Sequence, residues 1–301
     1  MTAYLFTYFI SEGEDIRYAL SRDAYTWYAV NDNKPVVNTA EISSTGGVRD
    51  PHILRGADGK TFYMVVTDLH TNLYGWGVPN TGMVLLKSDN LTDWQWSKID
   101  IPETYEQYSD MGNIWAPQVI YDPVAGKYMV YFSMTNRIVP AQFYYAYTND
   151  NFTAFEDVPQ PFFANPNGNG SIDADIIEKD GRYHLFFKSR NESRPGIMKA
   201  VSNSVNSGYE IAGERLLNPT ESDVEGSSVF KLISSDEYIL MYDVFREGRY
   251  QFTKSTDLLN FEVIDEDISM NFHPRHGTVM PVTEAEVQRI IKKWGITTDN
   301  F

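Results

Sequence analysis

Asp50-Pro51-His52-Ile53-Leu54 is the stretch that decides the fold. A turn at Asp58-Gly59 joins it to a second run, Thr61-Phe-Tyr-Met-Val-Val-Thr67. Both runs have the length of a strand and are rich in β-branched and aromatic residues, and an Asp-Gly step between such runs is typical of a β-hairpin. The pair therefore predicts two adjacent antiparallel strands.

This hairpin recurs along the chain at nearly constant spacing. The matching first strands are Asp50–Leu54, Ala116–Ile120, Asp173–Ile177, Glu225–Val229 and His276–Met280. Their starting points lie 66, 57, 52 and 51 residues apart. A second marker recurs in phase with the first: Ser21-Arg-Asp23 with Trp27, Ser88-Asp-Asn90 with Trp94, Thr148-Asn-Asp150 with Phe155, and Ser255-Thr-Asp257 with Phe261. Repeats of roughly 40–50 residues with about four strands each are typical of a β-propeller.

Five copies predict an all-β, five-bladed β-propeller that occupies residues 1–301 as a single domain. We expect the fifth blade to be shared between the chain ends, with outer strands from Ala3–Val30 and the inner strand from Thr278–Val282. Such closure leaves no open sheet edge. A short C-terminal helix is predicted from the capping-box pattern Thr283-Glu-Ala-Glu286, with its end near Gly295.

The composition excludes several classes of partner. The chain has 25 Lys and Arg against 41 Asp and Glu, a net charge of −16, and no cysteine. An acidic balance argues against nucleic acid and against an anionic membrane surface, and no run approaches the roughly 18 apolar residues of a membrane helix. The absence of cysteine excludes thiol catalysis and thiolate metal sites, whereas the compartment stays open between an intracellular protein and a mature form without its leader.

The first residue of each repeat points to chemistry. Inner strands of a propeller start near the central axis, so Asp50, Ala116, Asp173, Glu225 and His276 are expected around one funnel. Each carboxylate alone could cap a turn, but three that converge on one axis repel one another. Glycosidic hydrolysis uses one carboxylic acid and one carboxylate, and a third carboxylate raises the pKa of the acid. A non-catalytic carbohydrate-binding propeller is the alternative.

At these residues the sequence resembles glycoside hydrolase family 43. The resemblance rests on Arg49-Asp50-Pro51, Ile172-Asp173, Val224-Glu225-Gly226 and Asn113-Ile-Trp115-Ala-Pro117. It implies an inverting hydrolase in which Asp50 is the general base, Glu225 the general acid and Asp173 the residue that modulates the pKa of the acid. Asp175, two residues further along the same strand, is an alternative to Asp173, and the repeat phase favours Asp173.

Four further residues are candidates near the axis. The resemblance implies that His276 helps to hold a central ion, often calcium, or a water; a hydrogen-bonded core histidine is the alternative, because calcium prefers oxygen ligands. Trp115 is expected either to stack on a sugar or to pack between blades. Arg275 and Arg246 are candidates for hydrogen bonds to sugar hydroxyls. No other cofactor is expected.

The resemblance also implies a substrate class. It points to an α-L-arabinofuranosidase that acts on side chains of plant polysaccharides or on oligosaccharides containing arabinose or xylose. A β-xylosidase and a galactofuranosidase on the same scaffold stay open as alternatives.

Overall fold

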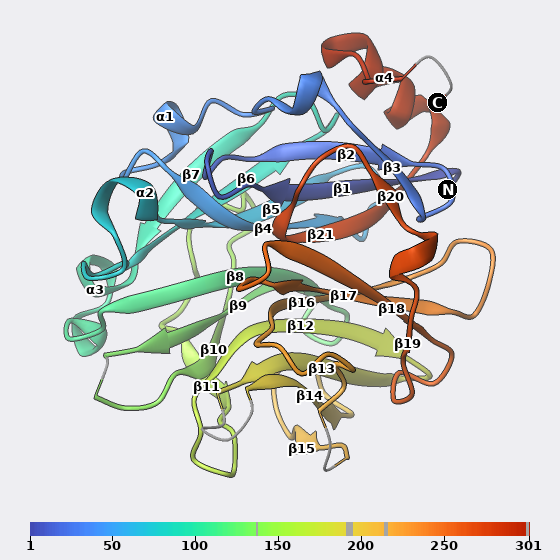
Figure 1. Cartoon of the computed structure of the whole chain (residues 1–301). Coiled ribbons are helices and arrows are strands. Elements are labelled where there is room, and N and C mark those ends of the chain that lie inside the picture. The colour runs from blue at the N-terminus through green and yellow to red at the C-terminus, as the bar shows by residue number, and fades with distance from the viewer. Residues whose placement is uncertain (137, 191–194, 214–215, 299–300) are drawn as a thin grey trace.

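Five sheets lie around one central axis in the computed structural model (Figure 1), which describes residues 1–136, 138–190, 195–213, 216–298 and 301. Their strands pair in antiparallel fashion except for one outermost pair in the fifth sheet, which is parallel. The innermost strand of each sheet contacts the innermost strands of its two neighbours, so that the five inner strands form a closed circle. The predicted all-β, five-bladed propeller is confirmed.

Four blades are continuous in sequence, and each runs from the axis outward. The first blade consists of β4 (Val48–Arg55), β5 (Phe62–Asp68), β6 (Gly82–Ser88) and β7 (Gln95–Asp100). The second consists of β8 (Asn113–Asp122), β9 (Lys127–Thr135), β10 (Gln142–Tyr147) and β11 (Gln160–Phe163). The third consists of β12 (Ser171–Lys179), β13 (Arg182–Ser189), β14 (Gly196–Ser202) and β15 (Glu210–Ile211). The fourth consists of β16 (Glu225–Lys231), β17 (Tyr238–Val244), β18 (Arg249–Ser255) and β19 (Glu262–Val263).

The fifth blade joins the two ends of the chain. Its strands, from the axis outward, are β21 (Arg275–Val282), β1 (Ala3–Phe9), β2 (Arg17–Ser21), β3 (Thr26–Ala29) and β20 (Ser269–Met270). The inner strand β21 pairs with β1 in antiparallel register, Leu5 opposite Met280. The predicted closure by N-terminal outer strands and a C-terminal inner strand is confirmed, and both termini lie on the same side of Figure 1.

Helices are short and peripheral. The α-helices are α1 (Thr39–Ile42), α2 (Thr71–Tyr74), α3 (Ile101–Thr104) and α4 (Glu284–Trp294), and the 3-10 turns are η1 (Asn31–Asn33), η2 (Glu106–Tyr108) and η3 (Asp265–Asp267). The predicted capping box is present at α4, since the Thr283 amide donates to the Glu286 carboxylate at 2.8 Å and the Glu286 amide to the Thr283 hydroxyl at 3.4 Å. None of the helices in the described residues has the length and apolar character needed to cross a membrane.

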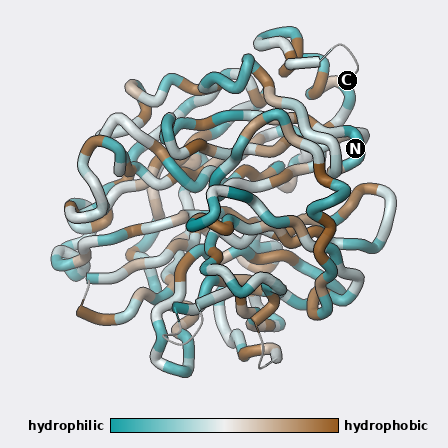
Figure 2. The backbone as a smooth tube through the Cα atoms, in the orientation of Figure 1, coloured by the Kyte–Doolittle hydropathy of each residue, from teal (hydrophilic) through white to brown (hydrophobic). Residues whose placement is uncertain are grey.

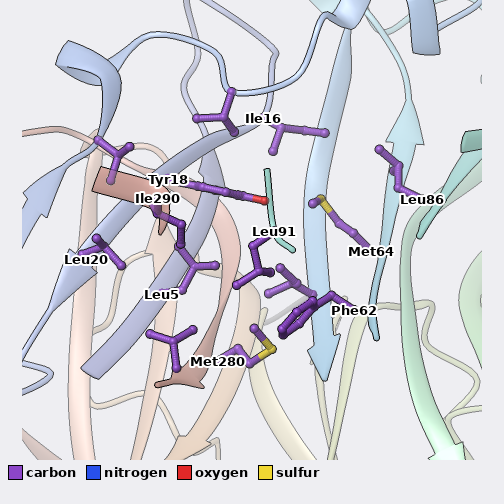
Figure 3. Close-up of a cluster of buried hydrophobic side chains, with 14 of the residues drawn as sticks. Leu5, Ile16, Tyr18, Leu20, Phe62, Met64, Leu86, Leu91, Met280 and Ile290 are labelled. Carbon is purple, nitrogen blue, oxygen red and sulfur yellow. The ribbon is translucent and has the colours of Figure 1, made fainter. Parts of the chain in front are cut away.

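The core lies between neighbouring blades. In Figure 3, Met280 of the fifth blade lies beside Phe62 of the first, and Leu5 of the fifth blade and Ile290 of α4 belong to the same cluster. Figure 2 shows hydrophobic segments along the strands and hydrophilic segments at many of the connections. Full burial of one such side chain contributes about 1.5–3 kcal/mol to stability, so α4 closes an apolar seam between two blades.

The second sequence marker forms a turn between the third and the outer strand of a blade. The Ser88 hydroxyl accepts the amides of Asn90 and Leu91, and the Asn90 side chain accepts those of Thr92 and Asp93. The hydroxyls of Ser21 and Ser255 accept backbone amides in the same way. The marker therefore repeats because the short polar side chains satisfy the backbone of a tight turn.

Every inner strand carries a β-bulge close to its first residues. The pairing register shifts after Arg49, Trp115, Ile172, Glu225 and Arg275. The next residue has a positive φ in four blades: 53° at Asp50, 46° at Ala116, 57° at Asp173 and 66° at Gly226. The repeat alignment is thus wrong by one residue in the fourth blade, since Glu225 is equivalent to Arg49 and Ile172 rather than to Asp50 and Asp173.

Candidate active site

A cavity of about 460 Å³ opens where the inner strands begin. Seven of the residues singled out in the sequence line it, whereas Ala116 and Asp175 do not. The seven are Asp50, Trp115, Asp173, Glu225, Arg246, Arg275 and His276. They come from all five blades, so residues up to 226 positions apart in the sequence line one cavity. The predicted convergence of the repeats on one funnel is therefore present in the structure.

The bulges sort these side chains into layers along the axis. Residues just before the bulge form one layer, which contains Arg49, Trp115, Ile172, Glu225 and Arg275. Asp50, Asp173 and His276 follow in the bulge itself and line the same cavity. Because the extra residue turns the chain, two consecutive residues of one strand both reach the cavity, which a regular strand would not allow.

Asp50 is held as a carboxylate. Its Oδ2 accepts a hydrogen bond from the Thr67 hydroxyl at 2.9 Å, and its Oδ1 lies 3.4 Å from Nδ1 of His276. Burial raises the pKa of Asp50, but the His276 contact, Arg49 and Thr67 outweigh it and bring the pKa below its ordinary value. Asp50 is thus ionised and available to accept a proton.

His276 is the cationic partner of this carboxylate. Burial lowers its pKa, whereas the hydrogen bond to Asp50 and the charges of Asp173 and Glu225 raise it to about 9. The ring also packs against Gly226, where an added Cβ would lie 2.8 Å from Cγ of His276 at a φ of +66°. Glycine at this position therefore serves both the positive φ and the close approach of the imidazole.

Asp173 differs from Asp50 in its protonation. Its Oδ2 accepts the Gly226 amide at 2.8 Å, and its backbone carbonyl accepts the Ser227 hydroxyl at 2.9 Å. Burial is the main reason that its pKa rises to about 6, and the charges of Glu225 and Asp50 add to it against the opposing charge of His276. Both hydrogen bonds attach Asp173 to the residues that directly follow Glu225.

Glu225 lies between two cations. Nζ of Lys188 donates to its Oε2 at 3.3 Å, and Nη2 of Arg275 lies 3.8 Å from its Oε1. The Glu225 side chain is 26% exposed and therefore in contact with the open part of the cavity. Two neighbouring positive charges stabilise the carboxylate that remains when this residue gives up a proton.

Asp243 is a cavity residue that the sequence analysis missed. It pairs with Glu225 across β16 and β17, and Nε of Arg275 donates to its Oδ2. Burial raises its pKa to about 6, although Arg275 opposes this. Lys188 was also missed. Asp243 and Lys188 each stand at the end of the second strand of a blade, opposite the first residues of the inner strand, and the sequence analysis compared only the inner strands. Alignment of those strand ends was the signal that could have found them.

Asp175, the alternative to Asp173, lies outside the cavity lining. The bulge moves it to a deeper layer, where its Oδ2 accepts the Val229 amide at 2.5 Å and its Oδ1 lies 3.9 Å from Nε2 of His52. Burial raises its pKa to about 7 and lowers that of His52 to about 3. The side chain therefore joins the third blade to the fourth beneath the site.

The remaining candidates occupy the cavity wall. Trp115 is half-buried and lines the hollow, and its stacking on a sugar stays a prediction. Arg275 is engaged with Asp243 and with the Ser11 hydroxyl at 2.8 Å, so it acts as a fixed charge next to Glu225. Arg246 is exposed at the rim, where its Nε donates to Asp223 at 3.0 Å.

Among the residues that the structure describes, no group of three His, Asp or Glu side chains is placed to hold a metal ion. Nδ1 of His276 lies 3.4 Å from the Asp50 carboxylate, so this nitrogen is engaged with Asp50. A calcium ion near the axis stays a prediction.

Residues 1–288 match the model of a family related to glycoside hydrolase family 43, described as a probable glycosyl hydrolase domain. The chain belongs to this family. The resemblance found in the sequence is thereby confirmed, and membership supports a glycosidase over a non-catalytic carbohydrate-binding propeller.

A curated relative and several solved structures are similar to this family member. An α-L-arabinofuranosidase of Bifidobacterium longum is 24% identical over 268 residues, which cover 74% of this chain. The match covers only 25% of that relative, so the chain spans about a quarter of its length.

Two solved structures share the fold. An endo-1,4-β-xylanase of Bacteroides thetaiotaomicron aligns with a TM-score of 0.61 and 13% identity over 87% of this chain and 90% of its own. An α-L-arabinofuranosidase of Clostridium thermocellum aligns with a TM-score of 0.61 and 13% identity over 86% of this chain and 85% of its own.

Proposed function

We propose that this protein is an inverting glycosidase that releases α-L-arabinofuranosyl groups from oligosaccharides or polysaccharide side chains. The observation that carries the reaction is that one cavity holds two carboxyl groups in different settings: Asp50 is kept ionised beside His276, and Glu225 is partly exposed between Lys188 and Arg275. The arabinofuranosyl group is supported by the curated relative.

In the proposed reaction Asp50 is the general base. It takes a proton from a water molecule whose oxygen forms the new bond to the anomeric carbon. Glu225 gives its proton to the glycosidic oxygen as the bond between that oxygen and the anomeric carbon breaks. The product therefore has the opposite anomeric configuration, and solvent restores both protonation states.

The other groups support these two steps. His276 keeps Asp50 ionised, as its contact at 3.4 Å and the lowered pKa of Asp50 indicate. Lys188 and Arg275 stabilise the Glu225 carboxylate as it forms. Asp173 fixes the backbone next to Glu225 through the Gly226 amide, and we assign it the modulating role because it is attached to the residue that follows the acid.

A panel of aryl glycosides tests this proposal. The 4-nitrophenyl α-L-arabinofuranoside, β-D-xyloside and β-D-galactofuranoside are each offered to the wild type and to Glu225→Gln. We expect release from the arabinofuranoside, and only a small loss of it in Glu225→Gln because 4-nitrophenolate leaves with little protonation. Preference for either of the other two sugars would overturn the sugar assignment. Full activity of Glu225→Gln on an unactivated substrate, α-1,5-linked arabinotriose, would overturn the assignment of the acid.

A further inference from the structure

A second cavity of about 670 Å³ adjoins the first. The two share Trp76, Trp115 and Arg190 as a common wall. The second cavity continues over the start of β8 and the end of β9, along the segment 138–141 and Gly170. A molecule that extends beyond the first cavity on this side enters the second one directly.

Several large hydrophobic side chains in the wall of this second cavity are exposed to solvent. Half of the large hydrophobic side chains that the described residues expose lie in two short segments, 73–78 and 138–139. Three of them line the second cavity: Trp76 is 63% exposed, Ile138 88% and Val139 45%. Concentrated apolar exposure beside a polar site marks a binding surface.

Trp76 is held in place although its ring is exposed. The Arg49 guanidinium lies 4.9 Å from the centre of the Trp76 ring and 4.5 Å from that of Phe9. Nη1 of Arg49 donates to the fully buried Glu14 at 2.7 Å. One face of the indole is thereby supported from below.

The segment that carries Trp76 is anchored by the same carboxylate. Glu14 accepts the amide of Thr71 at 2.9 Å and that of Asn72 at 3.0 Å, and the Asn72 side chain donates to the Ser11 carbonyl at 2.5 Å. Burial raises the pKa of Glu14, but these hydrogen bonds and Arg49 bring it below its ordinary value. The aromatic ring is therefore preorganised, which reduces the entropy lost on binding.

We propose that the second cavity binds a further sugar unit of the same carbohydrate chain, whose apolar ring face lies on Trp76. The inference rests on the proposed function and adds to it the place where the oligosaccharide or polysaccharide binds beyond the sugar that is released. A sugar presents an apolar C–H face and a polar edge, and this cavity is lined by an exposed indole and by the charged side chain of Arg190. The two cavities adjoin at Trp76, Trp115 and Arg190, so one carbohydrate chain can extend from the first over these side chains into the second.

The test compares a short and a long substrate. Values of kcat/KM are measured for methyl α-L-arabinofuranoside and for α-1,5-linked arabinotriose with the wild type, Trp76→Ala and the matched control Trp96→Ala. Trp96 is also exposed, at 43%, but it lies on β7 outside both linings. We expect Trp76→Ala to lower the preference for arabinotriose over the methyl glycoside about tenfold, mainly through KM. An unchanged preference would overturn the inference.

A second pair of measurements separates this inference from the proposed function. Because the Trp76 side chain is largely exposed, we expect Trp76→Ala to unfold within about 2 °C of the wild type. Such a result shows that the variant is folded. If the wild type cleaves neither arabinoside, the proposed function is wrong, and calorimetric titration with arabinotriose, xylotriose and β-1,3-linked galactotriose decides the inference. Binding of one of them that is weakened by Trp76→Ala and not by Trp96→Ala supports it; binding of none, or equal binding by both variants, overturns it.

Discussion

Asp173 and Asp175 are two residues apart on β12, yet they belong to different regions of the molecule. Asp173 lines the cavity and bonds to the Gly226 amide, whereas Asp175 lies one layer deeper and bonds to the Val229 amide. Burial raises the pKa of both, to about 6 and about 7. A perturbed pKa alone therefore does not mark a reacting group; access to the cavity, provided by the bulge, separates the two layers.

The largest effect is expected in the cavity layer, from Glu225→Gln. It removes the proposed proton donor, and general acid catalysis contributes about 10²–10⁴-fold. We expect kcat on arabinotriose to fall by that factor, and to fall less on an aryl arabinoside whose leaving group needs little protonation. Glu262→Gln, an exposed change on β19, is the matched control. Equal losses on both substrates would contradict the role of Glu225 as acid.

Asp173→Asn tests the same layer with a smaller effect. It weakens a charge-assisted hydrogen bond to the Gly226 amide, a contact worth about 1.5–3 kcal/mol, so we expect kcat/KM to fall about 10- to 100-fold. Steady-state kinetics from pH 4 to 9 measure the change. A loss as large as that of Glu225→Gln, with no change in the pH profile, would contradict a modulating role.

His276→Gln is expected to move the acid limb of the pH profile. Loss of the imidazolium lets the pKa of Asp50 rise, by about 1–3 units for a neighbouring opposite charge. Because Asp50 acts as a base only when ionised, kcat/KM then falls at a higher pH on acidification. His273→Gln, at an exposed position, is the control. An acid limb at the wild-type pH would contradict the pairing of His276 with Asp50.

The smallest effect on activity is expected from Asp175→Asn in the deeper layer. Its native pKa, about 7, lies above the ordinary value of 3.8, so the wild type is stabilised below pH 4 and loses that contribution as pH rises toward 7. Asparagine resembles the protonated carboxyl and does not ionise. The unfolding temperature of the variant minus that of the wild type should therefore be larger at pH 8 than at pH 4.5. We expect kcat to stay within about twofold of the wild-type value.

Asp89→Asn, an exposed change in a turn, is the control for this comparison. A large loss of kcat in Asp175→Asn with unchanged stability would place Asp175 in the reacting layer and break the distinction from Asp173.

Much of the fold was predictable because each blade repeats the same local chemistry. Hairpin turns, the Ser88 type of turn and the closure by β1 and β21 all leave marks in the sequence. The bulge leaves a weaker mark in the sequence. Asp50 and Asp173 adopt a positive φ at the bulge without being glycine, whereas the fourth blade has Gly226 at this position. That difference is why the alignment set Glu225 one residue out of position.

The parts of the site that escaped the sequence come from neighbouring strands and loops. Asp243 reaches the site because it pairs with Glu225 across β16 and β17, and Lys188, which pairs with Ile172, reaches Glu225 from the neighbouring blade. Their own runs look like ordinary buried strands. Trp76 reaches the cavity through a loop whose position depends on Glu14, 62 residues earlier. Such contacts depend on tertiary packing, which no local pattern records.

The central claim is that Asp50 activates water while Glu225 protonates the leaving oxygen on the other side of the scissile bond. Proton NMR of the first product released from an α-L-arabinofuranoside, recorded before the free sugar equilibrates, tests it most directly. We predict that β-L-arabinofuranose appears first. First appearance of the α anomer would mean a covalent intermediate and would contradict the role assigned to Asp50.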